Sequence, residues 1–306
     1  MAIKASSCLV CKKRSMHKLF SAENKGIQWK YYRCYSCDLI KIHPIPSKQQ
    51  LRKIYSYSNE EKQARTNRII NLLYKLPLGK ILLSLYNSLL IGKRYSMVLK
   101  LANRGSLLDV GCGSGHFLSK FQDQNIIKKG IEVNKTLAEL ARQRIGKENV
   151  YVTKIESFRT AAKFEVITLW HTLEHLAKPD KILNKLNSLL SKNGKLVIEV
   201  PNGQSLARKV FSRHWQLLMP GQHLYFFSEK SLRKLLEKNG FKVLKINYYG
   251  IVSYSLSSSV ANLLISKGLN FTLSVAVSLI LFLPTILFNF CAFKWRENLM
   301  IIAVKK

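Results

Sequence analysis

Acidic residues are scarce in this chain of 306 residues. It contains 17 Asp and Glu against 50 Lys and Arg, which gives a formal net charge of +33. A surface of this kind attracts anions, so the composition argues against a protein without charged partners. It favours phospholipid headgroups, nucleic acid or phosphorylated metabolites. A general bias toward Lys, Ile and Asn explains part of the basic excess, but it does not explain the shortage of acids.

The chain also lacks several features that would place it in other classes. Its first ten residues carry one Lys and no long apolar core, which predicts no secretory leader and a cytoplasmic protein. We find no internal repeat and no low-complexity tract. With 47% apolar and 22% charged residues, the chain has material for one large core plus additional elements. Disordered and fibrous classes are therefore excluded.

The cysteines are few and unevenly distributed. Four of the six form two pairs, Cys8 with Cys11 and Cys34 with Cys37, and each pair has a two-residue spacer. This is metal spacing rather than a disulfide framework, because both thiolates of such a pair can bind one tetrahedral ion. The ion would supply folding energy that a core of this size lacks. We therefore predict a structural zinc ribbon over residues 1–46.

Two alternatives to a four-cysteine site remain open at this point. The distance between the two pairs is slightly longer than usual, so His17 or His43 could replace one cysteine. Without a metal, the same residues would form a reduced, thiol-rich hairpin.

The next segment, residues 47–103, has a helical pattern of apolar residues and is expected to form a linker and lid. Pro77 and Gly79 divide it. The stretch 81–91 is apolar almost all round, so it either packs in a core or lies on an apolar surface, and core packing is the simpler interpretation.

From residue 104 onward, short apolar runs alternate with amphipathic helical stretches. The runs are residues 107–110, 129–133, 150–153, 166–170, 195–200, 242–246 and 299–304. Seven strands with interleaved helices predict a doubly wound α/β sheet.

A glycine-rich segment follows the first of these runs. Residues 107–118 read LLDVGCGSGHFL, an apolar strand with an acid near its end and three glycines before a helix. A Gly-x-Gly-x-Gly loop brings backbone N–H groups close to a ligand at a helix N-terminus. By itself this pattern also fits a dinucleotide-binding loop. Glu132 follows Gly115 by 17 residues, at the end of the second run, where it can accept both ribose hydroxyls of an adenosine.

These residues resemble those of class I S-adenosylmethionine-dependent methyltransferases. The likeness continues through residues 164–176 (FEVITLWHTLEHL), 194–202 (GKLVIEVPN), 223–228 (HLYFFS) and 239–241 (NGF). It covers roughly residues 95–250 and the last strand, and it points to a group with ubiquinone-pathway O-methyltransferases and zinc-ribbon sugar methyltransferases. The resemblance implies a Rossmann-like, seven-stranded methyltransferase sheet over residues 104–306, with a hydrophobic helical insertion before the last strand.

S-adenosylmethionine is the cofactor that this resemblance implies. It places the glycines of the loop against the methionine part of the donor, Glu132 on the ribose, and Ile155 with Glu156 beside the adenine. Asp109 would stabilise the conformation of the loop. Cys112 has a simpler explanation as a small residue packed under the loop. The implied donor-binding residues are Asp109, Gly111, Cys112, Gly113, Gly115, Glu132, Val133, Ile155, Glu156 and His171.

The segment HTLEH, residues 171–175, matches the His-x-x-Glu-His pattern of inverted zinc proteases. We reject that interpretation because the segment follows a sheet strand rather than lying within a long helix. Ligands bind at the carboxyl ends of strands in open α/β sheets, so we expect His171, Glu174 and His175 to face donor and acceptor. His175 and His223 are the predicted general bases for methyl transfer to oxygen; the alternative is that they only hold loops.

A divalent metal at the same place is a further hypothesis. Small-RNA 2′-O-methyltransferases and ubiquinone-pathway enzymes, which this stretch resembles, have similar residues around an ion. The four ligands here would be His171, Glu174, His175 and His223, with His171 at a position where Glu is usual. Such an ion would bind a diol or catechol and lower the pKa of a hydroxyl.

Two other methylation chemistries are disfavoured. The sequence has no Asp/Asn-Pro-Pro-Tyr/Phe motif after the fourth strand, as adenine amino-group methylation would require. It also has no cysteine placed for covalent attack on a base, because Cys112 lies in the donor loop and Cys291 in an apolar segment.

The segment 251–293 is nearly without charge. Lys267 is the single charged residue between residues 247 and 293, and residues 268–293 carry none. This length could cross a bilayer, but the last strand follows at once and must return to the sheet. We therefore expect an even number of passes or a re-entrant hairpin, bent near Lys267 and Gly268 and kinked at Pro284, on an anionic membrane surface. A dimer interface and a cap over an apolar substrate are the alternatives.

The sequence thus predicts a cytoplasmic methyltransferase, attached to the membrane face, that acts on a hydroxyl of a sugar, lipid-linked or quinone-like metabolite. A zinc-ribbon RNA methyltransferase is less favoured, because the basic residues are dispersed and RNA binding does not require an apolar insertion. A non-catalytic scaffold that binds S-adenosylmethionine is the alternative from another class. The sequence leaves the acceptor, the methylated atom and the oligomeric state undetermined.

Overall fold

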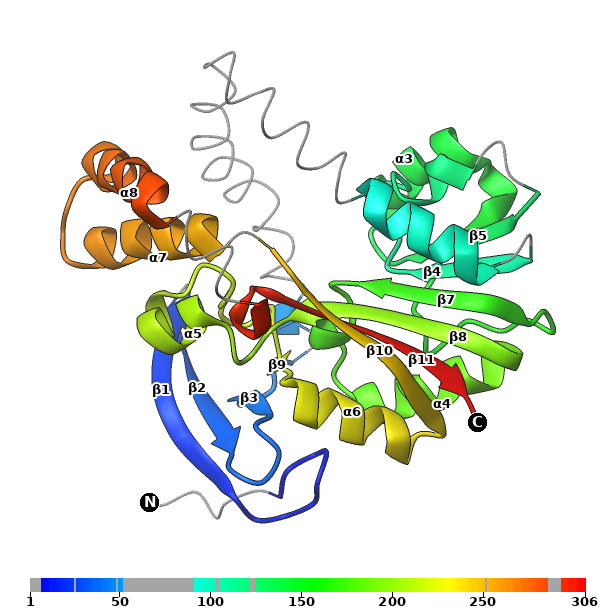
Figure 1. Cartoon of the computed structure of the whole chain (residues 1–306), viewed down its shortest axis with the longest axis horizontal. Helices are drawn as coiled ribbons and strands as arrows, with labels where there is room; N and C mark the ends of the chain where they lie inside the picture. The colour runs from blue at the N-terminus through cyan, green and yellow to red at the C-terminus, as the bar shows by residue number, and fades with distance from the viewer. Residues whose placement is uncertain are drawn as a thin grey trace.

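The computed structural model describes residues 7–24, 26–47, 49–51, 91–102, 105–121, 125–250, 252–285 and 293–306 (Figure 1). Of the predicted linker and lid, residues 49–51 and 91–102 are helical. The remainder of that segment, including Pro77, Gly79 and the apolar stretch 81–90, lies outside the described residues.

A seven-stranded sheet forms the centre of the molecule. Its strand order is β10-β11-β8-β7-β4-β5-β6, and only β11 runs against its neighbours. All seven predicted runs are strands of this sheet, so the doubly wound α/β prediction is confirmed. The strands are β4 (Ser106–Val110), β5 (Ile127–Glu132), β6 (Val150–Val152), β7 (Phe164–Trp170), β8 (Leu190–Pro201), β10 (Phe241–Tyr249) and β11 (Asn298–Lys305).

Alternate residues of the strands enter two cores, one on each side of the sheet. Leu108 and Ile198 belong to the core with helices α4 (Pro179–Leu189) and α6 (Glu229–Lys238). Leu107 and Val197 belong to the core with α3 (Lys135–Ile145) and the helical residues 91–102. This division follows from the two-residue repeat of a strand, which points neighbouring side chains to opposite faces. Figure 1 shows α3 and α4 on opposite sides of the sheet.

The order of connections reverses at β4. From β4 the chain continues outward through β5 and β6, and it then returns to β7 and β8 on the other side. In doubly wound sheets the loops after the two strands that flank such a point enclose a crevice, which is where ligands bind. Four short 3-10 helices of the described chain follow strands β4, β7 and β8 or precede β11: η1 (Leu118–Phe121), η3 (Leu173–His175), η4 (Ser212–His214) and η5 (Phe293–Trp295). Another, η2 (Lys147–Asn149), precedes β6 at the opposite edge of the sheet.

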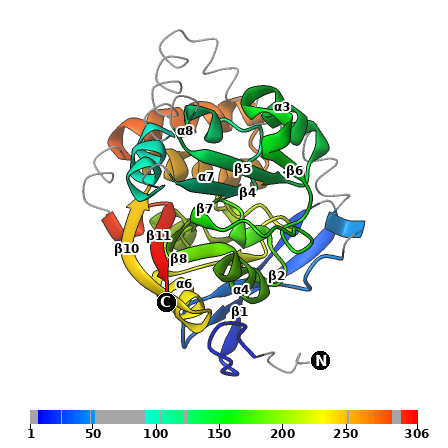
Figure 2. The same ribbon diagram turned by 90° about the vertical axis from the view of Figure 1, so that its right-hand side faces the viewer.

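A second, four-stranded sheet joins the N-terminal segment to this domain. Its order is β1-β2-β3-β9, with β1 (Met16–Asn24), β2 (Ile27–Cys34) and β3 (Ile40–His43) from the cysteine-containing segment. The fourth strand, β9 (Tyr225–Phe226), comes from the loop between β8 and α6. The fully buried Trp29 and Tyr31 of β2 belong to the same core as α4 and α6. The predicted ribbon is therefore packed onto the domain of the seven-stranded sheet (Figure 2).

The apolar insertion forms two helices in the described residues, α7 (Val252–Ser266) and α8 (Phe271–Thr285). They pack against each other, and the turn between them contains Gly268 with a φ of 91°. The predicted bend near Lys267 and Gly268 is observed. Among the described residues, no helix has both the length and the hydropathy needed to span a membrane. Figure 1 shows this hairpin projecting beyond α5 (Leu206–Phe211), away from the central sheet.

Candidate active site

The glycine loop after β4 adopts a backbone that favours glycine. Gly111, Gly113 and Gly115 have φ angles of 78°, 55° and 79°, in the left-handed region. A Cβ on Gly111 would lie 2.5 Å from Oγ1 of Thr172, and one on Gly115 would lie 3.0 Å from Cα of Ala141. A Cβ on Gly113 would meet open space. Gly113 is thus the point where the loop backbone is open to a ligand.

Glu132 at the end of β5 accepts hydrogen bonds from this loop and from its own turn. Oε2 accepts from the backbone N–H of Gly113 at 2.9 Å, and Oε1 accepts from Val133 and Asn134, both at 2.8 Å. Each carboxylate oxygen has two lone pairs, so Oε1 is fully used and Oε2 has one left. The same side chain can therefore fix the loop and still accept one hydrogen bond from a ribose hydroxyl, whereas the sequence predicted that it accepts both hydroxyls.

Asp109 and Cys112 lie below the loop rather than on its surface. Asp109 is 1% exposed and accepts a hydrogen bond from Thr168 Oγ1 at 2.7 Å. Burial raises the pKa of Asp109 to about 7. Cys112 is buried against Gly130, and burial with the nearby Asp109 raises the pKa of its thiol. This geometry agrees with a supporting role for Asp109 and with the packed, unreactive alternative for Cys112.

The residues predicted beside the adenine lie after β6. Ile155 is buried, whereas Glu156 is exposed. Val133 is 62% exposed at the end of β5, and Thr153 donates its backbone N–H to the carbonyl of Glu132. Val133 thus directly follows Glu132, and Ile155 and Glu156 follow the end of β6 that this bond joins to it. Their contact with the donor remains a prediction.

His171 lies between two buried carboxylates at the end of β7. Its Nε2 is 3.2 Å from Oε1 of Glu199, and its Nδ1 is 3.4 Å from Oε1 of Glu174. Burial opposes a positive charge here, but the two carboxylates outweigh it and raise the pKa of His171 to about 9. The backbone of His171 has a φ of 50°, a strained conformation for a residue other than glycine. His171 is therefore held as a cation that donates a hydrogen bond to Glu199 and forms an ion pair with Glu174.

Arg94 and Glu199 are site residues that the sequence analysis missed. Arg94 donates two hydrogen bonds to Glu199, from Nε at 3.1 Å and Nη2 at 2.6 Å. Its guanidinium also lies 4.7 Å from the ring centroid of Trp170. Burial opposes ionisation of Glu199, yet His171 and Arg94 lower its pKa to about 2. Glu199 could have been found from the sequence, because it is an acid inside the otherwise apolar run 196–200. No comparable sequence pattern marks Arg94.

Glu174, His175 and His223 converge on one point of the crevice. One ligand atom from each lies within 4.8 Å of the others, and the two imidazole rings are 4.7 Å apart. Glu174 is fully buried, and neither of its carboxylate oxygens has a hydrogen-bond donor within the parts of the chain that the structure describes. Burial favours its neutral form, but His171, His175 and His223 lower its pKa. The predicted four-residue cluster is thus a group of three, with His171 beside it.

Both histidines of this group have a defined tautomer. Nδ1 of His175 lies 3.0 Å from the carbonyl of Gln222, and Nδ1 of His223 lies 2.8 Å from the carbonyl of Leu217. Because a carbonyl only accepts, each Nδ1 carries a proton, and the neutral form of each ring has its lone pair on Nε2. Burial and His175 lower the pKa of His223 to about 3, so His223 is neutral. A buried carboxylate and two imidazoles oriented in this way can accept protons or hold a divalent cation.

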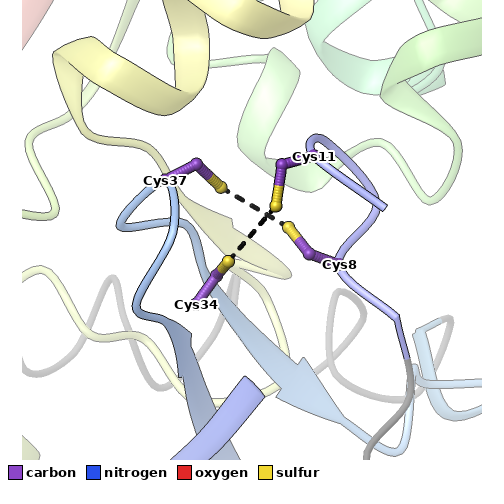
Figure 3. Close-up of side chains that lie close together, drawn as sticks. All are labelled: Cys8, Cys11, Cys34 and Cys37. Atoms are coloured by element: carbon purple, nitrogen blue, oxygen red, sulfur yellow. Dashed lines mark hydrogen bonds between the residues drawn. The ribbon is translucent and has the colours of Figure 1, made fainter. Parts of the chain in front are cut away.

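The four paired cysteines come together at the other end of the ribbon (Figure 3). Sγ of Cys8 lies 3.5 Å from that of Cys37, and Sγ of Cys11 lies 3.5 Å from that of Cys34. Tetrahedral zinc, with Zn–S bonds of about 2.3 Å, separates its sulfurs by about 3.8 Å, so the group fits this ion. His17 stacks on Tyr35 and His43 faces Tyr32. The described cluster contains neither histidine.

Backbone hydrogen bonds connect the ribbon to the crevice. Ile42 of β3 donates its N–H to the carbonyl of Leu224, and Leu224 donates its own N–H to the carbonyl of Glu174, at 3.1 and 2.9 Å. The hydroxyl of Ser228 also donates to the carbonyl of Cys37 at 3.0 Å. His223 therefore precedes a strand that the ribbon holds at its edge.

Comparisons with known proteins agree with this geometry. A family profile described as "Methyltransferase domain" matches residues 86–246. A ubiquinone biosynthesis O-methyltransferase from Coxiella burnetii is 26% identical over 155 residues, which is 46% of this chain and 64% of that protein. An uncharacterised protein from Methanocaldococcus jannaschii is 27% identical over 46% of this chain and 67% of its own length. The solved StiE O-MT structure has a TM-score of 0.52 and 13% identity, covers 79% of this chain and 81% of its own, and supports the fold.

Proposed function

Because this chain belongs to the class I S-adenosylmethionine-dependent methyltransferase family, we propose that it methylates a hydroxyl group of a sugar, lipid-linked or quinone-like metabolite at the cytoplasmic face of a membrane. The similarity to ubiquinone biosynthesis O-methyltransferases supports oxygen as the acceptor atom. The chain matches less than two thirds of the length of those enzymes. Its acceptor is therefore argued from the site.

The observation that carries the proposal is the position of His175 and His223, each with an Nε2 lone pair, at the crevice beside the donor loop. Methylation of an alcohol or phenol requires a group that takes the hydroxyl proton. His175 is only half-buried, whereas His223 is 4% exposed and kept neutral, so we assign the proton acceptor to His175.

The reaction then follows from the placement of the groups. The hydroxyl oxygen attacks the methyl carbon in line with the sulfonium, so that a C–O bond forms while the C–S bond breaks. The oxygen's proton moves to Nε2 of His175, and neutral S-adenosylhomocysteine leaves. The buried carboxylate of Glu174 stabilises the imidazolium that forms.

A divalent metal fits the same three residues. Glu174, His175 and His223 would hold it, because they offer one carboxylate and two imidazoles, a common donor set for divalent transition metals. When bound, such an ion lowers the pKa of a coordinated hydroxyl. Gln222 and Leu217 fix both ring orientations, so Nε2 of each ring would be the ligand atom. His175 would then not also accept the hydroxyl proton, so metal ligand and general base are alternative roles for this residue.

The insertion supports the membrane part of the proposal. On α7 and α8, the side chains of Ile265, Leu273 and Ile280 are 40%, 50% and 70% exposed. Exposed aliphatic side chains gathered on one hairpin mark an interaction surface, and the net charge of +33 would favour an anionic bilayer.

The experiment that tests the function uses the purified chain, with and without detergent, and S-adenosylmethionine labelled in its methyl group. It is incubated with a cell extract, which is then separated into lipid, soluble-metabolite and RNA fractions. Label in lipid or lipid-linked sugar is the expected result. Label in RNA would show that the acceptor is RNA and would contradict the proposed acceptor class. Tight donor binding without transfer to any fraction would indicate a non-catalytic scaffold.

A further inference from the structure

A buried arginine lies beside the ribbon and forms no ion pair with an acidic side chain among the described residues. Arg208 of α5 is 8% exposed, and its Nε contacts no acceptor within the described ranges. The backbone N–H of Arg208 is satisfied by the N-cap Ser205, so the unmet requirement belongs to the guanidinium. Removing a guanidinium from water is costly unless an anion compensates its charge. Among the described residues, the guanidinium of Arg208 thus lacks a compensating anion.

The charges around Arg208 do not compensate it. Burial and the positive charge of Arg33 lower the pKa of Arg208 to about 10, and Asp38 opposes this effect. Burial and the positive charges of Arg208 and Arg33 also lower the pKa of Lys209. Asp38 already accepts two hydrogen bonds from Arg33, at 3.1 and 2.6 Å. Within the described part of the chain, these three cations and one acid leave an excess of two positive charges.

The cluster of Arg208, Arg33 and Lys209 lies between the crevice and the insertion. Helix α5 follows the carboxyl end of β8, and Figure 1 shows it between the ribbon strands and α7. The Nζ of Lys209 lies 5.8 Å from the ring of Trp295, in the segment that returns from α8 to β11. Trp295 is 52% exposed. The basic groups therefore lie at the base of the apolar hairpin.

We propose that Arg208, Arg33 and Lys209 form a binding site for a phosphate group of an amphiphile whose apolar part lies along α7 and α8. A dianionic phosphate or a pyrophosphate matches the charge excess, and its oxygens match the fork of a guanidinium. The assignment of this amphiphile as the methyl acceptor rests on the proposed function. The phosphate site itself depends only on the cluster.

A lipid phosphate fits better than RNA. A nucleic-acid surface presents a row of cations with aromatic stacking platforms, whereas this cluster is a single point next to exposed aliphatic side chains. Charge and apolar surface together favour a ligand with one anionic group and a hydrocarbon part.

The test uses the full chain in detergent, with inorganic pyrophosphate as the probe and without S-adenosylmethionine. We expect Arg208→Met to weaken pyrophosphate binding about 10- to 100-fold, because hydrogen bonds to a charged group are lost. Arg233→Met, which removes the same charge from α6, should bind as the wild type does. Isothermal titration calorimetry measures both. Equal affinity in Arg208→Met and wild type would overturn the site.

Thermal unfolding separates this result from misfolding. Without pyrophosphate, Arg208→Met should unfold at the wild-type temperature or higher, since an uncompensated charge has been removed. Pyrophosphate should raise the unfolding temperature of the wild type but not that of the variant. An equal rise in both proteins would contradict the proposal.

Two further measurements distinguish a phosphate on the methyl acceptor from a phosphate on a membrane lipid. If the acceptor carries it, Arg208→Met raises the acceptor KM and leaves sedimentation with phosphatidic acid vesicles unchanged. If a headgroup carries it, sedimentation with vesicles of phosphatidylcholine and phosphatidic acid falls, while phosphatidylcholine alone shows no difference. Binding of single-stranded RNA that pyrophosphate does not displace, with no vesicle or acceptor effect, would overturn the assignment. The pyrophosphate titration, thermal unfolding and vesicle sedimentation do not require methyl transfer, so they can succeed where the proposed reaction fails; only the acceptor KM depends on it.

Discussion

Glu132 connects the donor loop to the strand that is predicted to hold the ribose. Its carboxylate accepts from Gly113 on one side and from the turn after β5 on the other. We expect Glu132→Ala to weaken binding of S-adenosylhomocysteine about 10- to 100-fold, because charged hydrogen bonds are lost. Calorimetric titration measures this. Glu139→Ala on the exposed face of α3 is the control, and unchanged affinity in Glu132→Ala would contradict the assigned role.

His175 is the residue on which the proposed proton transfer depends. We expect His175→Gln to lower kcat about 10²- to 10⁴-fold, the usual contribution of a positioned base, while donor affinity is preserved. Initial rates with saturating donor provide the measurement, and His17→Gln on the ribbon surface provides the control. A variant that keeps wild-type kcat would assign the histidine a purely structural role.

Glu297 introduces a pH dependence of stability away from the crevice. It is 4% exposed and accepts a hydrogen bond from Trp215 Nε1 at 2.9 Å. Burial outweighs its hydrogen bonds and raises its pKa to about 7. An unfolded Glu titrates near pH 4.3, so the folded state binds more protons between about pH 4 and 7. The free energy of unfolding should therefore fall as pH rises through this window and level off above it.

Glu297→Gln should remove this part of the dependence and stabilise the protein by about 1–3 kcal/mol at pH 8. Asp109, whose pKa is also raised, would leave a residual slope in both proteins. Urea unfolding at pH 5 and pH 8 is the measurement. The same substitution at the exposed Glu139 should change neither value, and a parallel pH profile for Glu297→Gln would refute the argument.

At the scale of elements, the pairing of β3 with β9 connects the ribbon to the crevice. Leu224 lies between Ile42 and Glu174 in a chain of backbone hydrogen bonds. Replacing Cys34 and Cys37 by Ser, or removing zinc with a chelator, should loosen β9 and raise the acceptor KM at least about tenfold, or ~1.4 kcal/mol. Donor affinity should persist, because the donor loop lies on β4 and β5.

Steady-state kinetics with each substrate varied in turn tests this coupling. Ser36→Ala, in the same turn of the ribbon, is the matched control, and restored activity on adding Zn²⁺ to the chelated protein is expected. A folded double variant with wild-type acceptor KM would show that the ribbon has no part in the crevice.

The same pairing marks the limit of the sequence analysis. The seven strands could be predicted because each is a short apolar run with a turn at its ends, which is a local signal. The proximity of Glu174 and His175 could also be predicted, because the two residues are adjacent in the sequence. The register of Ile40 opposite Phe226 could not, since it joins residues far apart in sequence that carry no complementary pattern. Arg94 was missed for the same reason, because its partner Glu199 lies on a distant strand.

At the scale of the whole molecule, the basic surface and the apolar hairpin are expected to act together on an anionic bilayer. Ile280→Asp should reduce sedimentation with vesicles of phosphatidylcholine and phosphatidylserine, because it places a charge on a side chain that is 70% exposed on α8. Leu244→Asp makes the same change on β10, where the side chain is 52% exposed. Equal sedimentation of the two variants would exclude the hairpin as the contact surface.

The insertion begins and ends on neighbouring antiparallel strands, with Tyr249 of β10 opposite Asn298 of β11. A loop between such positions can lengthen or shorten without changing the order of the sheet, and the entropy of closing it grows only slowly with its length. The hairpin is therefore an exchangeable module. A shorter or longer insertion at this point would leave the strands that carry the crevice unchanged, so the surface that the hairpin forms can evolve separately from the reaction.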